Sequence, residues 1–497
     1  MIGMNTLPSR PIHSVSAWHW RSRPLNHRTG SQVFAALFLN QAIPSEACGA
    51  IATLLESPYP PSPDYPQLGR YSICAGSPRC IDGQPQLWTP AIGEVLPFLN
   101  RLISQAASNA ERNVEATASL PFTGGWLGWL GYDVAWEIER LPYVNPDLLP
   151  FPISYWYEPE CFAVLDHEQQ TLWLAATTPD QIDRMEQQLE TDSIVVSMAA
   201  PSALTPQFQV SQAPQFQLSQ VQHEAIVLKA KQYIEAGDIF QANLSLRFEV
   251  ETTAESWSIY RSLQQINPSP FASYWKTPWG AMISCSPERL VHSRDGMAQT
   301  RPIAGTRSRG HSPEQDQQLA AELLSNSKEL AEHIMLVDLE RNDLGRVCEW
   351  GSVAVDELLA IERYSHVMHL VSNVKGKLRS DVNAVDLIRA LFPGGTITGC
   401  PKVRCMEIIE ELEPVRRNLF YGSCGYLDWR GYLDLNILIR TLLYAQPPGH
   451  TAARVWGQVG AGIVADSDPE REWHESLHKA QAQLQALELA MSNLISS

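Results

Sequence analysis

Long apolar runs are missing from this chain of 497 residues. No segment reaches the about 18 consecutive apolar residues that a membrane-spanning helix needs, so we expect no membrane span. Residues 1–28 hold scattered Arg and His but no apolar core, so we expect no export signal. Basic residues are also scarce, because 37 Lys and Arg stand against 54 Asp and Glu, which gives a formal net charge of −17. This balance argues against nucleic acid and against an anionic membrane surface as partners.

Paired cysteine motifs are absent as well. The nine cysteines are dispersed, and no two of them form a Cys-x-x-Cys motif. An odd number of unpaired cysteines is typical of reduced thiols in a cytoplasmic protein. None of them stands in a Gly-rich elbow with a downstream His and Glu, so the chain shows no glutaminase motif of its own.

The length predicts two lobes, because single hydrophobic cores stop growing at roughly 250–300 residues. Residues 200–221 carry no charge and are rich in Ser, Pro, Gln and Ala. This composition predicts a linker between an N-terminal lobe, 1–199, and a C-terminal lobe, 222–497. Helical and strand patterns are mixed along the chain rather than regularly alternating, which indicates an α+β fold.

The C-terminal lobe gives the clearest predictions of individual elements. The end of the chain is predicted to form a helix that begins at Asp468-Pro469, because Asp is a good N-cap and Pro suits the first turn. The periodicity of the other apolar residues predicts helices at 221–236 and at 316–344, the latter broken near Ser325, and strands at 239–250, 280–285, 433–444 and 453–463.

This lobe contains two closely spaced pairs of glutamates. Glu329 and Glu332 lie three residues apart, as do Glu472 and Glu475. On a helix such a pair shares one face, although that face is most often simply solvated. Two acidic faces brought together would repel each other, whereas a hard divalent cation such as Mg²⁺ would be bound by oxygen ligands of this kind.

Eight blocks of sequence resemble the chorismate-utilising enzymes, which include the large subunits of anthranilate synthase and aminodeoxychorismate synthase. The blocks occur in the family's order and cover most of residues 222–490: GDIFQANLSLRF (237–248), SPERL (286–290), RPIAGTRSRG (301–310), ELAEHIMLVDLERNDLGRV (329–347), ERYSHVMHLVSNVKG (362–376), FPGGTITGCPKVRCMEIIEELEP (392–414), GYLDLNILIRT (431–441) and GAGIVADSDPEREW (460–473). The N-terminal lobe matches more thinly, through PFTGGWLGWLGYD (121–133) and two shorter segments. The resemblance implies β-sandwich-like sheets flanked by helices, with an active site in the C-terminal lobe.

The resemblance also implies roles for individual residues. Glu332 and Glu475 correspond to the family's Mg²⁺ ligands, and Glu329 and Glu472 to supporting positions. His369 corresponds to an active-site histidine, which without the resemblance would be taken for an ordinary buried one. Glu288 matches an acid/base residue of the amine-forming members. The resemblance further implies substrate contacts at Thr396, Arg440, Tyr421, Gly460, Gly462 and Lys479, and it makes Lys402 a weaker candidate.

Two positions separate the reactions within the family. Isochorismate and salicylate synthases have a lysine base where this chain has Gln241, and Gln cannot take up a proton, so ammonia is the favoured nucleophile. Many aminodeoxychorismate synthases have a nucleophilic lysine where this chain has Ala304. Alanine has no nucleophile, which favours anthranilate and direct attack by ammonia.

The residues at several other positions resemble the aminodeoxychorismate branch more closely, among them Asn243, SCSPERL (284–290) and YGSCGY (421–426). We therefore expect a Mg²⁺-dependent amination of chorismate to 4-amino-4-deoxychorismate, which serves para-aminobenzoate and folate synthesis. Anthranilate formation for tryptophan biosynthesis is the alternative. A third interpretation is an inactive paralogue that binds an aromatic ligand, and the presence of all four glutamates argues against it.

The resemblance finally implies two partners. Because this chain shows no glutaminase motif, ammonia is expected from a separate glutamine amidotransferase subunit. Ser57 in LLES and Pro268 in NPSPF resemble a pocket that binds tryptophan in both aminating branches. An ordinary packing contact between a strand end and a loop is the alternative for these two residues.

Overall fold

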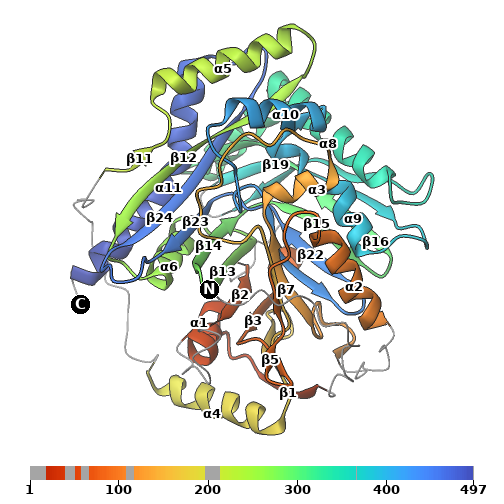
Figure 1. Cartoon of the computed structure of the whole chain (residues 1–497), viewed down its shortest axis with the longest axis vertical. Helices are drawn as coiled ribbons and strands as arrows, with labels where there is room; N and C mark the ends of the chain where they lie inside the picture. The colour runs from red at the N-terminus through yellow and green to blue at the C-terminus, as the bar shows by residue number, and fades with distance from the viewer. Residues whose placement is uncertain are drawn as a thin grey trace.

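Two large antiparallel sheets form the centre of the molecule, and helices lie outside them (Figure 1). The computed structural model describes residues 18–39, 51–57, 66–107, 117–195, 213–364 and 367–495. The first sheet has the order β1 (His19–Pro24), β10 (Thr171–Ala176), β9 (Cys161–Asp166), β3 (Tyr71–Ala75), β2 (Ala52–Glu56), β13 (Phe271–Thr277), β14 (Gly280–Ser286), β23 (Thr441–Ala445), β24 (Ala453–Ile463), β12 (Gln241–Thr252) and β11 (Gln215–Phe216), and β20 (Gly399–Cys400) also pairs with β12.

The second sheet carries the order β17 (Ile303–Ser308), β19 (Val367–Lys377), β16 (Met297–Arg301), β15 (Arg289–Arg294), β22 (Leu433–Asn436), β21 (Ser423–Asp428), β7 (Gly125–Leu130), β8 (Ser154–Tyr157) and β6 (Leu87–Trp88), with β18 (Ala354–Arg363) pairing to β19. A small hairpin joins β4 (Cys80–Ile81) and β5 (Gln84–Pro85). The helices are α1 (Gly30–Phe34), α2 (Val95–Ala107), α3 (Ala135–Ile138), α4 (Pro179–Val195), α5 (Gln220–Glu235), α6 (Ser256–Ile266), α7 (Pro313–Ser325), α8 (Ser327–Gly345), α9 (Ala384–Leu391), α10 (Lys402–Leu412) and α11 (Pro469–Ile495).

The main core lies between the two sheets. It is rich in large aromatic side chains, and the rings of Trp129 from β7 and Trp275 from β13 meet edge to face at 5.8 Å. A second core lies under α1, α4, α6 and α11 on the outer face of the first sheet. Apolar burial on both faces therefore fixes the position of this sheet.

Strands from both halves of the chain share each sheet. In the first sheet β2 pairs with β13, and in the second β7 pairs with β21. The division into lobes 1–199 and 222–497 stays a prediction, although these pairings join the two segments. Of the predicted linker, 200–212 lies outside the described residues, and the rest contains β11 and the start of α5.

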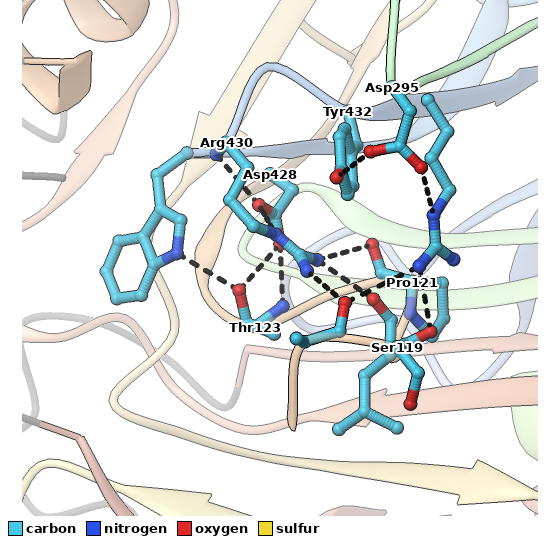
Figure 2. Close-up of polar contacts among 11 residues, drawn as sticks. Ser119, Pro121, Thr123, Asp295, Asp428, Arg430 and Tyr432 are labelled. Carbon is cyan, nitrogen blue, oxygen red and sulfur yellow. Dashed lines mark hydrogen bonds and ion pairs between the residues drawn. The ribbon is translucent and has the colours of Figure 1, made fainter. Parts of the chain in front are cut away.

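A turn with a buried carboxylate fastens the two halves together at one end of β21 (Figure 2). The Asp428 carboxylate accepts hydrogen bonds from the backbone of Thr123 at 2.6 Å and from Nε of Arg430 at 2.7 Å. The Arg430 guanidinium in turn donates to the carbonyl oxygens of Ala118 and Leu120. One acidic side chain and one basic side chain thus satisfy the backbone of a segment about 300 residues away in the sequence.

Most of the predicted elements of the C-terminal lobe are present. The α+β class is confirmed. The predicted break near Ser325 is confirmed, since α7 ends there and the side chain of Asn326 caps α8 by accepting from the backbone of Lys328 and Glu329. The single strand predicted at 433–444 is wrong. It is divided into β22 and β23, and Arg440, just before β23, has a left-handed φ of 52°.

Among the described residues, no helix is both long enough and apolar enough to cross a membrane.

Candidate functional site

Strands β12 and β24, near one edge of the first sheet, bring several of the predicted site residues together. Gln241, the first residue of β12, donates from Nε2 to Oε1 of Glu332 on α8 at 2.6 Å. A methyl group at Gly462 of β24 would lie 2.2 Å from that same Nε2 atom and 3.3 Å from the Glu332 oxygen. The hydrogen bond therefore passes close over Gly462, and a side chain there would displace the Gln241 amide.

Gly460 forms the second part of this floor. Its carbonyl oxygen accepts a hydrogen bond from Nζ of Lys479 at 2.9 Å, and Lys479 also pairs with Glu475 one turn earlier on α11 at 2.8 Å. Arg440 donates to the backbone oxygen of Lys479 at 2.9 Å, so the guanidinium is held beside α11. The predicted residues of α8, β24 and α11 thus meet around two glycines.

The carboxylates of the two acidic helix faces influence one another. Burial raises the pKa of Glu332, and the negative charge of Glu475 raises it further. Burial also raises the pKa of Glu472, against a hydrogen bond from Ser467. Burial acts in the same direction on Glu475, but the charges of Lys479 and Lys328 outweigh it and hold its pKa below the ordinary value. The two predicted acidic faces are therefore electrostatic neighbours.

Glu329 has a partner of its own. Arg307 of β17 donates to Oε1 of Glu329 at 2.8 Å, while Oε2 is buried and accepts no hydrogen bond within the described part of the chain. Its oxygens, together with those of the other glutamates, fit a hard divalent cation. Within the same described ranges, however, no three His, Cys, Asp or Glu side chains converge on one point. Cation binding therefore requires these carboxylates to move closer together.

Glu288 is a buried carboxyl group next to Thr396. Burial raises its pKa to about 8, and the Thr396 hydroxyl and the backbone of Ile303 only partly oppose that effect. Glu288 is therefore protonated at neutral pH and can donate a proton.

His369 lies on β19 and has the opposite character. Its Nδ1 is 2.9 Å from the hydroxyl of Thr306. Burial, with a smaller contribution from the charge of Arg440, lowers its pKa to about 4, although a hydrogen bond to the backbone of Gly305 opposes this. The imidazole is therefore neutral at physiological pH. Ala304 is flanked on β17 by Ile303, whose backbone contacts Glu288, and by Gly305, whose backbone contacts His369.

Tyr421 belongs to a buried stack of rings and guanidinium groups. Arg417 lies between the rings of Tyr132 and Tyr421, at 4.7 and 4.6 Å from their centres. It also donates to the carbonyl oxygens of Ile397 and Asn243, at 2.8 and 2.7 Å. This arginine, which the sequence analysis did not single out, holds the loop that carries Thr396 against β12.

A separate cavity of about 440 Å³ contains Ser57. Ser57 donates to the carbonyl oxygens of Leu68, at 2.8 Å, and Pro270. Pro270 lines the cavity, whereas Pro268, the residue chosen from the sequence, does not belong to its lining. Polar and charged groups, including Arg289 and Asp434, form much of the wall.

The structure also shows the contacts of three further basic residues, one of them predicted and two not. Lys402, the weaker candidate, donates from Nζ to the Asp343 carboxylate at 2.5 Å and to the carbonyl oxygen of Leu391. The sequence analysis missed Lys328 and Arg307, which face the acidic cluster. A spacing signal for Lys328 was present, because it lies four residues before Glu332 on the same helix face.

Comparison with known proteins places this site in a family. The model of the chorismate binding enzymes matches residues 71–485. An "anthranilate synthase component I-like protein" of Synechocystis is 59% identical over 98% of this chain and 95% of its own length. "Aminodeoxychorismate synthase component 1" of Bacillus subtilis is 43% identical over 85% of this chain and 90% of its own length. "Anthranilate synthase component 1" of Synechocystis is also 43% identical, over 84% of this chain and 88% of its own.

A solved structure agrees with these relatives. The crystal structure of anthranilate synthase component I from Streptococcus pneumoniae has a TM-score of 0.66 and 30% identity, and the match covers 90% of this chain and 93% of that one. With the family model spanning most of its length, the chain belongs to the chorismate-binding enzymes.

Proposed function

We propose that this protein aminates chorismate with ammonia in a Mg²⁺-dependent reaction whose product is 4-amino-4-deoxychorismate. The observation that carries the proposal is that a protonated Glu288 and a neutral His369 contact the backbones of Ile303 and Gly305, the two neighbours of Ala304. Two groups whose pKa values are pushed apart in this way are typical of acid–base catalysis. Gln241 cannot activate water as a base, which supports ammonia as the nucleophile.

The side chains of this chain account for the proton movements. A C–N bond forms as ammonia attacks the ring, and the C4–O bond breaks. Glu288 gives its proton to the departing hydroxyl, which leaves as water, and the proton lost from nitrogen restores the balance. Arg440 is held by Lys479 close to the site, where a guanidinium suits a substrate carboxylate.

The acidic residues would bind the metal. Glu332 and Glu475 would hold Mg²⁺ directly, with Glu329 and Glu472 in supporting positions. When bound, Mg²⁺ would neutralise a carboxylate of chorismate and draw electron density from the ring. Lys479, already hydrogen-bonded to Glu475, orients that carboxylate.

The relatives include proteins named for both products. Synechocystis has a protein named anthranilate synthase component 1 that is 43% identical to this chain, and a different protein, named only as similar to it, that is 59% identical. The chain thus resembles the second protein more than the named anthranilate synthase. The aminodeoxychorismate synthase component 1 of Bacillus subtilis is as similar to this chain as the named anthranilate synthase of Synechocystis is.

One observation favours anthranilate as the alternative product. Ala304 is buried in β17 and offers no nucleophile, so a covalent lysine adduct cannot form there. Under the main proposal, direct attack by ammonia takes the place of that adduct.

Two partners complete the proposal. A glutamine amidotransferase subunit would supply ammonia in the cytoplasm, which the names of the relatives support, since they are called component 1 or component I. The cavity at Ser57 would bind tryptophan as a regulatory or structural ligand, and titration of the protein with tryptophan in a calorimeter tests that assignment.

Product identification is the experiment that tests the function. The purified chain is incubated with chorismate, MgCl₂ and ammonium chloride, and chromatography separates 4-amino-4-deoxychorismate from fluorescent anthranilate. We expect the first product. Anthranilate alone would select the alternative, and no turnover by folded protein at any ammonium level would indicate a binding-only paralogue.

The substitution Ala304→Lys adds a test of the C4 route. A pocket shaped for amination at C4 should let the new amine attack the ring, so mass spectrometry of the trapped protein should show a covalent adduct. A variant that folds, consumes chorismate and forms no adduct would argue for the anthranilate alternative.

A further inference from the structure

The guanidinium of Arg417 joins three segments of the chain near the site. Arg417 is 1% exposed and donates to the carbonyl oxygens of Ile397, at 2.8 Å, and Asn243, at 2.7 Å. Two further hydrogen bonds reach both carboxylate oxygens of Glu413, at 2.6 and 2.9 Å. A planar guanidinium serves acceptors in several fixed directions at once, whereas a lysine ammonium on its flexible stem does not. The loop before α10 and the start of β12 are therefore fixed to one side chain.

Two aromatic rings pack against the same guanidinium. Its central carbon lies 4.7 Å from the ring centre of Tyr132 and 4.6 Å from that of Tyr421. Tyr421 has a left-handed φ of 64°, which a residue with a side chain adopts only where its surroundings hold it. The stack contributes to that support, and one of its two rings comes from the N-terminal half of the chain.

The segments fixed by Arg417 carry groups of the candidate site. Ile397 follows Thr396, whose hydroxyl lies against the buried carboxyl group of Glu288 and opposes the rise in its pKa. The hydroxyl of Tyr421 would be 2.8 Å from a methyl group at Gly460, so it lies at the glycine floor of the site. A displacement of about 1 Å in such groups can lower the rate of a reaction about 100-fold.

We infer that Arg417 is a positioning residue of the chorismate reaction, and that Tyr132 brings the N-terminal half of the chain into the ordering of the site. The inference rests on the proposed function, but not on which product forms. Four hydrogen bonds to protein acceptors use all but one of the N–H groups of the guanidinium. Arg417 therefore acts through Thr396 and Tyr421 rather than by binding the substrate itself.

Steady-state kinetics of Arg417→Lys test the inference. The variant keeps a positive charge beside Glu413 but loses the planar fork and the flat packing against both rings. With MgCl₂ and ammonium chloride, kcat for the consumption of chorismate should fall about 100-fold. The KM for chorismate should stay within about threefold of the wild type, because the residues proposed to hold its carboxylates are unchanged.

The preceding residue provides a matched control. Arg416 is also buried, and its guanidinium lies 4.0 and 3.8 Å from the ring centres of Trp136 and Tyr143. Its side-chain nitrogen atoms donate no hydrogen bond within the part of the chain that the structure describes. Arg416→Lys should therefore leave kcat within about twofold of the wild type, even if thermal unfolding shows an equal loss of stability in both lysine variants.

A double-mutant cycle separates positioning from an independent effect. In a background with Thr396→Val and Tyr421→Phe, the two hydroxyls through which Arg417 is inferred to act are gone. Adding Arg417→Lys should then lower kcat by less than about threefold, because substitutions that act through the same groups are not additive. A further fall of about 100-fold in this background would show that Arg417 acts independently of both hydroxyls, and would overturn the inference.

Substitutions at Tyr132 test the contribution of the N-terminal half and decide the case if Arg417→Lys does not fold. Tyr132→Leu removes one ring from the stack and should lower kcat about tenfold, as expected for a buried cation–π contact, whereas Tyr132→Phe keeps the ring and should retain kcat. Equal kcat in these two variants, or wild-type kcat in Arg417→Lys, would refute the inference while the amination itself stands. A wild-type protein that does not consume chorismate with ammonium would refute the proposed function and the inference together.

Discussion

At the scale of single residues, Glu288 and His369 show how burial sets chemistry. Both side chains are withdrawn from water, and burial disfavours the charged form of each. The carboxyl group is therefore kept protonated and the imidazole neutral, whereas in an ion pair both side chains would be charged. An acid and an uncharged hydrogen-bonding base result without any pairing between them.

Glu288 should also make stability depend on pH. Its pKa is raised by burial to about 8 from an ordinary value of 4.5, so its stabilising contribution is full below pH 4.5 and is lost as the pH rises through 8. Between pH 6 and pH 9 the wild type should lose about 3 kcal/mol of unfolding free energy that Glu288→Gln does not lose. Urea denaturation at both pH values measures this difference. A variant with the same pH dependence as the wild type would show that Glu288 is ionised in the folded protein.

Glu332 is the residue on which the proposed metal site depends most. Glu332→Gln should reduce Mg²⁺-dependent turnover by more than about 100-fold, since even an outer partner of a metal ligand is worth about 10- to 100-fold. The fold should be retained, because the residue is only half-buried. Glu470→Gln, in the first turn of α11 and exposed, is the control. Full activity in Glu332→Gln with an unchanged requirement for Mg²⁺ would disprove the assignment.

Sequence alone could name these residues but not their partners. The resemblance placed Glu288, His369 and Glu332 at functional positions, and the structure brings Glu332 together with Gln241. The contacts of Arg307 with Glu329 and of Thr306 with His369 join residues 22 and 63 positions apart. Such contacts depend on how β17 and β19 pair with α8 beside them, which no local pattern specifies.

At the scale of elements, β24 acts as a floor because Gly460 and Gly462, two of its three glycines, have no side chain at the site. The periodic pattern of 453–463 predicted this strand with its exact ends. The pattern did not predict the break before β23, where Arg440 adopts a left-handed backbone, because the residue type gives no sign of it. The Arg440 side chain also donates to the backbone oxygen of Lys479 on α11, a tertiary contact that no local pattern predicts.

Gly462→Ala tests the floor. The new methyl group would lie 2.2 Å from Nε2 of Gln241, so the Gln241–Glu332 hydrogen bond must shift. We expect a loss of about 1–2 kcal/mol of stability, typical of overpacking, and at least about a tenfold decrease in kcat/KM for chorismate. Gly345→Ala, at the end of α8, is the control because its methyl group would meet no atom within 4 Å. Equal kinetics for the two variants would show that the glycine is not needed at the site.

At the scale of the whole molecule, the two halves of the chain complete each other's sheets. Composition suggested a boundary near 200–221, because an uncharged segment rich in Pro and Ser is typical of a linker. Composition carries no information on strand pairing over more than 200 residues, and β2 with β13 is such a pair. The linker therefore connects segments whose sheets are continuous, and the site on β12 and β24 belongs to a sheet that begins with β1.

This continuity predicts that residues 213–497 will not fold as an independent unit. Without the first half, β13 loses its pairing with β2 from Ala272 to Lys276, and β21 loses its pairing with β7 from Ser423 to Asp428. The exposed edges and the uncovered aromatic core between the sheets should cause aggregation. In calorimetry, the full chain should unfold in a single transition, the fragment should show none, and coexpression with residues 1–199 should restore it. A soluble fragment with its own cooperative transition would instead establish two separable lobes, since a sheet that tolerates the loss of its neighbouring strands does not need them to fold.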